Sequence, residues 1–168
     1  MHLMDETSSS EACSVAKVAQ QEAETYCERL PLHLCHGCDG CGMRCTEGVK
    51  ITYSEYVRIA RFLHEHPDDS ERVQAQDKSI PGWPITQFCQ FRDTELDRCS
   101  IYPVRPVICR LFGHTEWLPC PLELVPLQGT EAMDLYQQYA QEKLQPFDEW
   151  RREAECGGES RCALDDRP

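Results

Sequence analysis

The sequence predicts a small α+β domain, mainly helical, in which loops and a short β-hairpin surround a cysteine cluster and a bound metal stabilises the fold. Two observations lead to this prediction. The chain of 168 residues contains 12 cysteines, and its apolar content is low for a formal charge of −12. A small core of that kind is commonly supported by disulfides or metal ions. In addition, segments with helical spacing of apolar residues flank a middle that is rich in Cys and Gly.

Helices are predicted on both sides of the first cysteine-rich segment. Apolar residues recur at near-helical spacing after a capping-box pattern, which predicts a helix over residues 9–29. A second capping box, formed by Thr52 and Glu55, predicts a helix over residues 53–65. Residues 35–50 lie between these helices, and we expect them to form a loop that is held by ligands.

A hairpin is predicted further along the chain. Residues 67–84 are polar and interrupted by proline and glycine, so we expect an irregular connection with one helical turn over 71–76. Residues 85–91 and 98–102 have strand character and are joined by a polar turn over 93–97.

The remaining elements are predicted to be helical. A brief helix over 107–112 follows Pro106, another helix spans 130–144, and Pro146 opens the last one. We therefore divide the chain into three parts, which are an N-terminal helix that packs on the core, a cysteine-cluster metal-binding domain, and C-terminal helices with a frayed tail. Their respective ranges are residues 1–34, 35–122 and 123–168.

The compartment decides between disulfides and metal. The first residues contain no export signal, which would combine basic, apolar and small residues. No run approaches the roughly 18 consecutive apolar residues of a membrane span. We therefore expect a cytoplasmic protein with no membrane partner, in which dense cysteines are more often metal ligands or catalytic groups than disulfides.

The charge balance excludes one further class of partner. The chain has 17 basic and 29 acidic residues and lacks the clustered Lys and Arg that contact with nucleic-acid phosphates needs. We expect no nucleic-acid partner, and a protein partner that the sequence does not identify.

The strongest motif has the spacing C-x2-C-x2-C-x3-C. Its members are Cys35, Cys38, Cys41 and Cys45. Interspersed glycines let a tight loop turn these thiols toward one centre, and the spacing matches the bacterial ferredoxin run. Thr46 replaces the proline of that run and no second copy occurs, which disfavours a two-cluster ferredoxin.

Four further thiols follow downstream. They are Cys89, Cys99, Cys109 and Cys120. The first two fall in the predicted strands, so a hairpin would bring them together. The eight candidate ligands are enough for one centre with spare thiols or for two centres with four ligands each, and the sequence leaves both arrangements open.

The order of these residues resembles a known family. The most specific part reads Cys99-Ser100-Ile101-Tyr102-Pro103-x-Arg105-Pro106-x2-Cys109-Arg110-x-Phe112, and it follows Cys38-x2-Cys41-Gly42-x2-Cys45, Ile51-Thr52 with Glu55, and Phe88-Cys89. Over about residues 35–122 this order is similar to the YkgJ-type cysteine-cluster family, the CxxCxxCC domain, which implies chelation of zinc or iron. Proteins with distant similarity include flagellin lysine N-methylase, which implies an iron–sulfur alternative to zinc.

One departure from the family pattern concerns the first motif. The family ends it with two adjacent cysteines, whereas this chain has Arg44 before Cys45. Cys35 is the candidate substitute for the missing thiol.

Other residues near the cluster have less specific interpretations. Arg105 and Arg110 flank Cys109, and they would either offset thiolate charge or form salt bridges with surface acids. We expect Tyr102 to be a packed strand aromatic, and His36 is a weaker candidate ligand.

The cysteines outside these groups are predicted to have other roles. Cys13 and Cys27 lie near one face of the first predicted helix and are expected to pack against the core, whereas Cys156 and Cys162 lie in a polar tail and are expected to be free.

These observations predict a metal-binding protein that carries an iron–sulfur cluster, of the four-iron type in preference to zinc, with a redox or electron-transfer role. The alternatives are a zinc-binding structural or protein-interaction module and, from the resemblance, a component of a protein-modifying, methyltransferase-like enzyme. No nucleophile motif, GxGxxG run or P-loop occurs, so the sequence assigns no catalytic residue and does not decide whether the protein is an enzyme.

Overall fold

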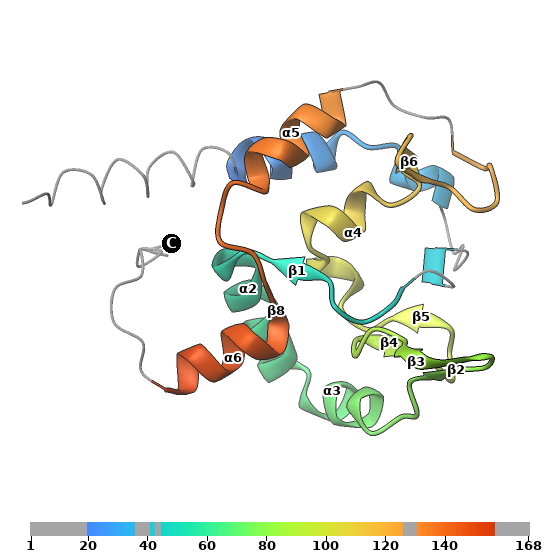
Figure 1. Cartoon of the computed structure of the whole chain (residues 1–168), viewed down its shortest axis with the longest axis vertical. Helices are drawn as coiled ribbons and strands as arrows, with labels where there is room; N and C mark the ends of the chain where they lie inside the picture. The colour runs from blue at the N-terminus through green and yellow to red at the C-terminus, as the bar shows by residue number, and fades with distance from the viewer. Residues whose placement is uncertain (1–19, 36–40, 43–44, 126–130, 157–168) are drawn as a thin grey trace, which may run out of the picture.

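The fold combines helices with two-stranded antiparallel sheets, which confirms the predicted α+β class (Figure 1). A computed structural model describes residues 20–35, 41–42, 45–125 and 131–156. Within these ranges, no helix combines the length and apolar composition that crossing a bilayer requires.

The helices lie at both ends of the described chain and between the hairpins. In chain order they are a helix over residues 20–28, the 3₁₀ turn η1 (Leu32–Cys35), α2 (Tyr53–Glu65), α3 (Pro67–Gln74), the 3₁₀ turn η3 (Tyr102–Val104), α4 (Val107–Leu111), α5 (Glu131–Tyr139) and α6 (Phe147–Glu155).

Each strand pairs with one partner. The pairs are β1 (Lys50–Ile51) with β8 (Gln145–Pro146), β2 (Ser79–Ile80) with β3 (Trp83–Gln87), β4 (Arg92–Asp93) with β5 (Arg98–Cys99), and β6 (His114–Thr115) with β7 (Leu118–Pro119). The β1–β8 pair joins distant parts of the chain and brings the C-terminal segment beside the start of α2.

The prediction for α2 is confirmed. The hydroxyl of Thr52 accepts a hydrogen bond from the Glu55 backbone N–H at 3.3 Å, and the Glu55 carboxylate accepts one from the Thr52 N–H at 3.0 Å. This reciprocal capping box fixes the first turn of the helix. Of the helix predicted over 9–29, residues 20–28 are helical and residues 9–19 lie outside the described ranges.

The predicted strand pairing is wrong. Residues 85–91 do not form one strand against 98–102, because β3 pairs with β2 across a turn in which Gly82 has a φ of +82°. The partner of β5 is β4 instead. Cys89 consequently lies in the connection between two hairpins, where its N–H donates to the carbonyl of Cys45 at 2.9 Å.

Three helical boundaries also differ from prediction. The segment after α2 forms α3 rather than an irregular connection with one turn over 71–76, because Pro67 occupies the first turn, where its missing N–H costs little. The helix predicted over 130–144 ends at Tyr139, and Tyr102 lies in η3 rather than in a strand.

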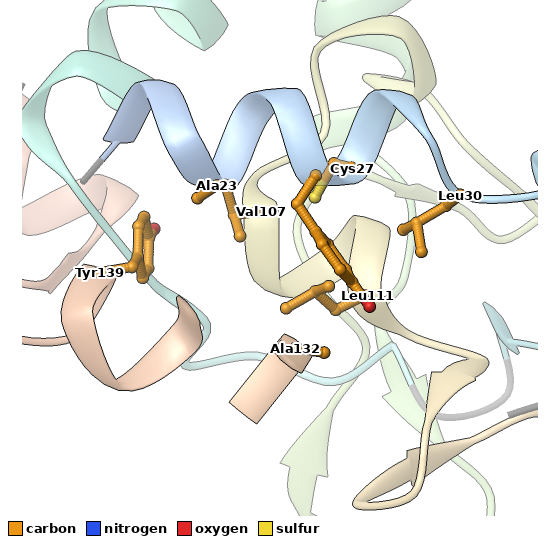
Figure 2. Packing of buried hydrophobic residues seen from close by; sticks show 8 residues of the cluster. Ala23, Cys27, Leu30, Val107, Leu111, Ala132 and Tyr139 are labelled. Atoms are coloured by element: carbon orange, nitrogen blue, oxygen red, sulfur yellow. The ribbon is translucent and has the colours of Figure 1, made fainter. Parts of the chain in front are cut away.

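The core has two parts. We name the first part the α4 cluster, because it joins the helix over 20–28 to α4 and α5 (Figure 2). Its buried members are Ala23, Tyr26, Cys27, Leu30, Val107, Leu111, Ala132 and Tyr139. Cys27 therefore packs in the core, as predicted, and is 1% exposed.

The second part, the α2–α6 cluster, joins α2 and α6 to the β4–β5 hairpin. Its buried members are Ile51, Ile59, Phe91, Ile101, Phe147 and Trp150. The indole N–H of Trp150 also donates to the carbonyl of Ile51 at 2.8 Å, so this side chain has both its apolar surface and its polar atom satisfied.

Replacing Trp150 by alanine is expected to lower the free energy of unfolding by about 3–5 kcal/mol, because it opens a cavity and leaves the Ile51 carbonyl without its donor. Chemical denaturation measures the change. Trp83→Ala is the matched control, since Trp83 is 65% exposed, and its effect is expected to stay within about 0.5 kcal/mol. Equal losses in the two variants would contradict the packing described for α6.

Candidate metal centre

Four cysteines from separate segments of the chain interact electrostatically with one another. Cys45 and Cys89 are joined by the backbone hydrogen bond described above, and their thiols are also hydrogen-bonded to each other. Cys99 lies in β5 and Cys109 in α4. The charge of Cys89 raises the pKa of both Cys99 and Cys109, so the four thiols form one electrostatic group. We call these four residues the thiol group.

The thiol group does not hold several negative charges by itself. The hydrogen bond between the first pair lowers the pKa of Cys89 to about 7 and raises that of Cys45. Burial raises the pKa of Cys99 to about 11, and it raises that of Cys109 as well. One thiolate is thus accessible near neutral pH, and further ionisation requires a cation within the group.

Backbone N–H groups are aimed at several of the sulfurs. The N–H of the residue two positions downstream donates to the thiol in each case, from Phe91 to Cys89 and from Ile101 to Cys99. Hydrogen bonds of this kind favour the thiolate and tune the properties of metal–thiolate centres.

The donor set fits a metal. Four thiolates suit a tetrahedral zinc ion or an iron–sulfur cluster. In the part of the chain that the structure describes, no three His, Cys, Asp or Glu side chains lie close enough together to bind one metal ion.

Two further predicted ligands, Cys41 and Cys120, lie beside Gly113. A Cβ atom placed on this glycine would lie 3.5 Å from the Cys41 sulfur and 3.8 Å from the Cys120 Cβ. Gly113 also has a φ of +90°, which favours glycine. Although burial opposes it, backbone N–H groups of residues 122–125 lower the pKa of Cys120. Cys120 therefore shares the thiolate-stabilising pattern of Cys89 and Cys99.

The other predicted cysteines cannot be placed at the centre. Cys38 lies outside the described residues, as do His36, Cys13 and Cys162, and of Cys35 the structure describes only the backbone in η1. Cys156 is exposed at the end of α6. This position agrees with the prediction that the Cys156 thiol is free.

The two flanking arginines divide between the two predicted roles. Arg110 forms an ion pair with Glu24, a carboxylate that Arg58 also contacts at 2.6 Å. Arg105 instead stacks on Tyr102, with its guanidinium carbon 3.8 Å from the ring centroid, and its charge lowers the pKa of Cys99 and Cys109 against the effect of burial.

Two cations at the centre were missed by the sequence analysis. The charge of Lys78 lowers the pKa of Cys89, and that of Arg92 lowers the pKa of Cys99. Arg92 follows Cys89 by three residues, which was the available signal. Lys78 carried none, because the β2–β3 hairpin brings it back to Cys89, where the Phe88 N–H donates to the Lys78 carbonyl at 2.7 Å.

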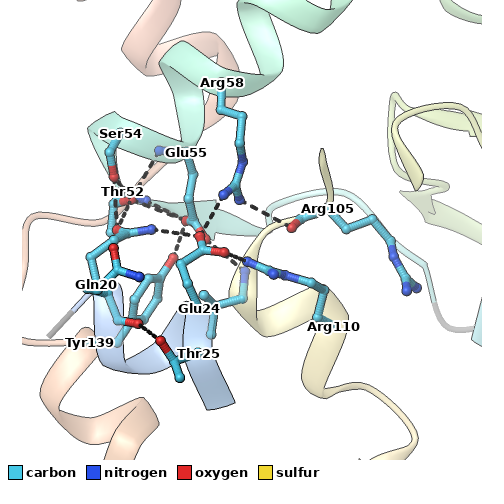
Figure 3. A network of polar contacts seen from close by, with 12 residues as sticks. Gln20, Glu24, Thr25, Thr52, Ser54, Glu55, Arg58, Arg105, Arg110 and Tyr139 are labelled. Carbon is cyan, nitrogen blue, oxygen red and sulfur yellow. Dashed lines mark hydrogen bonds and ion pairs between the residues drawn. The ribbon is translucent and has the colours of Figure 1, made fainter. Parts of the chain in front are cut away.

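Glu55 positions the helix that carries Cys109. Its carboxylate is fully buried and accepts hydrogen bonds from the Val107 backbone N–H at 2.7 Å and from the hydroxyl of Tyr139, in addition to the capping bond from Thr52 (Figure 3). Val107 is the first residue of α4, so one side chain fixes α2, α4 and α5 relative to each other. The capping-box pattern predicted the role of Glu55 at the start of α2, but nothing in the sequence indicated its contact with α4.

Comparison with known proteins places the chain in a family. The model of the CxxCxxCC family, described as a putative zinc- or iron-chelating domain, matches residues 37–139. The match confirms the resemblance of the cysteine motifs. No curated protein and no solved structure matches the chain.

Glu55→Gln is expected to destabilise the protein by about 1–3 kcal/mol, because an amide cannot accept all the hydrogen bonds that the buried carboxylate accepts. Chemical denaturation of the variant measures the loss. Glu65→Gln is the control in the same helix, where the side chain is exposed, and no change beyond about 0.5 kcal/mol is expected. A variant as stable as the wild type would show that the contact with α4 contributes nothing.

Glu142 provides a test by pH. Burial, and then the charge of Glu55, raise its pKa to about 7. An acid whose pKa is raised on folding destabilises the protein as pH increases from its unfolded value to its folded value. Glu142→Gln is therefore expected to stabilise the protein by about 1–2 kcal/mol at pH 8.

The stabilisation should shrink as pH falls toward 4.5, the ordinary value for Glu. Thermal unfolding across this range measures it. Glu155→Gln, at an exposed position, should show no such trend. A pH-independent difference for Glu142→Gln would contradict the described environment.

Proposed function

Because the chain belongs to the CxxCxxCC family, we propose that its thiol group ligates a metal centre and that this centre is an iron–sulfur cluster of the four-iron type with a redox or electron-transfer role. The ligands are Cys45, Cys89, Cys99 and Cys109. The mutual electrostatic influence of these four thiols, which come from segments spread over residues 45–109, is the observation that supports the proposal. Cys35, Cys38, Cys41 and Cys120 stay predictions as further ligands.

The spacing of the first motif, of which Cys45 is the member in the thiol group, favours iron–sulfur over zinc if the other cysteines of the run are ligands as well. The run C-x2-C-x2-C-x3-C is typical of bacterial ferredoxins. The cations support the same choice, because a redox cluster with thiolate ligands gains a further negative charge on reduction, and Lys78, Arg92 and Arg105 would offset it. The chemistry that the cluster supplies when bound is one-electron transfer.

The position of the thiol group links metal loading to folding. Cys89 and Cys99 pack against the α2–α6 cluster, whereas Cys109 belongs to the helix at the centre of the α4 cluster. Ligation would therefore hold the two parts of the core together. Without metal, the same place holds several thiols that ionise one at a time and resist further charge.

Metal and sulfide analysis of the protein purified without oxygen tests the proposal. Iron and acid-labile sulfide are expected, together with visible absorption that changes on reduction. A colourless protein that carries zinc would overturn the iron–sulfur assignment and favour the zinc-binding alternative. A protein free of metal and sulfide would overturn the metal centre itself.

Serine substitutions test the ligand assignment. Each of Cys89→Ser, Cys99→Ser and Cys109→Ser is expected to lose at least half of the bound metal and to unfold at a lower denaturant concentration. Metal content and denaturation are measured on the same samples. Cys27→Ala is the control for a buried cysteine and Cys156→Ser for an exposed one, and both should keep the wild-type metal content. Equal metal loss in a control and a ligand variant would contradict the assignment.

Removing the metal with a strong chelator is expected to abolish the cooperative unfolding transition, because the junction between the two parts of the core loses its ligand bonds. Circular dichroism during titration follows the change. A metal-free protein that keeps a cooperative transition at the same temperature would show that folding does not depend on the centre.

A further inference from the structure

Arg92 is a buried cation with little carboxylate compensation. Its side chain is 6% exposed, and its ion pair is with Asp97, at 2.7 Å, whose side chain is 72% exposed. Its Nε is buried and makes no hydrogen bond within the described part of the chain. Burying a charge beside one solvent-exposed partner is unfavourable unless other negative charge lies near it.

The surroundings of Arg92 identify that negative charge. Arg92 pairs with Cys99 across the β4–β5 hairpin, and its backbone N–H donates to the Cys89 carbonyl at 2.9 Å. In addition, the amino group of Lys78 donates to the Arg92 carbonyl, so a second cation is fixed to the same strand.

The guanidinium also lies against the first cysteine segment. A Cβ atom placed on Gly42 would collide with Nη1 of Arg92 and would lie 3.0 Å from its Cζ. Gly42 lies between Cys41 and Cys45. The guanidinium carbon of Arg92 is also 4.8 Å from the ring centroid of Phe88, the residue before Cys89. One side chain thus touches the neighbours of ligands from two separate segments.

We propose that Arg92 is a positioning residue of the thiol centre, which holds the backbone at Gly42 against the β4–β5 hairpin and offsets the negative charge of the ligated thiolates. The inference rests on the proposed function, because the thiolates carry full charge only when a metal binds them. Gly42 lacks a side chain so that the planar guanidinium can approach its backbone. Arginine suits both tasks, since its charge is permanent and its fork is rigid.

Three variants separate the two tasks. Arg92→Gln removes the charge, Arg92→Lys keeps the charge without the fork, and Gly42→Ala obstructs the approach without changing charge. Arg98→Gln is the control, because Arg98 is an exposed arginine in the same hairpin. All are compared with the wild type, loaded with metal, for the rate of metal release to a chelator and, where the centre is redox-active, for the midpoint potential.

Arg92→Gln and Gly42→Ala are expected to release metal about tenfold faster or more, the usual effect of losing an outer-shell partner. Combining them should add little to either, because both remove the same contact. The potential should become more negative in Arg92→Gln, whereas Arg92→Lys should keep the wild-type potential and still release metal faster. Arg98→Gln should match the wild type in both measurements.

The inference would be overturned if Arg92→Gln released metal at the wild-type rate. It would also be overturned if Arg98→Gln accelerated metal release as much as Arg92→Gln does. Equal potentials in a redox-active Arg92→Gln and wild type would remove the charge role. The wild-type metal content reports separately on the proposed function. A zinc-loaded wild type would refute the iron–sulfur cluster while leaving Arg92 testable by release rate, and a wild type without metal would refute both.

Discussion

The constraint with the widest consequences is the mutual repulsion that four thiols of this chain would experience as thiolates. Cys89 and Cys99 pack against the α2–α6 cluster, and Cys109 lies in the helix that supplies Val107 and Leu111 to the α4 cluster. These thiols cannot all ionise unaided, because burial and mutual repulsion oppose it. Under the proposed function, a bound cation would relieve this repulsion.

Buried charged side chains extend this organisation into the surrounding helices and hairpins. Glu55 is satisfied by backbone and hydroxyl donors from three elements, whereas Arg92 faces the ligand segments. Arg110 and Glu24 form an ion pair beside the α4 cluster. Each of these groups joins segments that are distant in sequence, which is a role that a small apolar core cannot fill alone.

Local sequence patterns predicted those features that depend on interactions between residues close together in the chain. The capping box of Thr52 and Glu55 places α2 correctly because its hydrogen bonds lie within one turn. Strand pairing depends on contacts between segments, and here β4 rather than residues 85–91 pairs with β5. The cysteine motifs placed the chain in its family, whereas the set of ligands stays a prediction. The approach of Arg92 to Gly42 could not be predicted, because it exists only once two distant segments are folded together.

The pairing of β1 with β8 limits how far the chain can be shortened at its C-terminal end. The family match ends at residue 139, yet β8 and α6 follow it and supply Phe147 and Trp150 to the core around α2. A recombinant fragment trimmed to the matched region would expose an apolar face of α2 to solvent, and the fragment would be prone to aggregate. The unit that must be expressed intact is therefore larger than the unit that sequence comparison delineates.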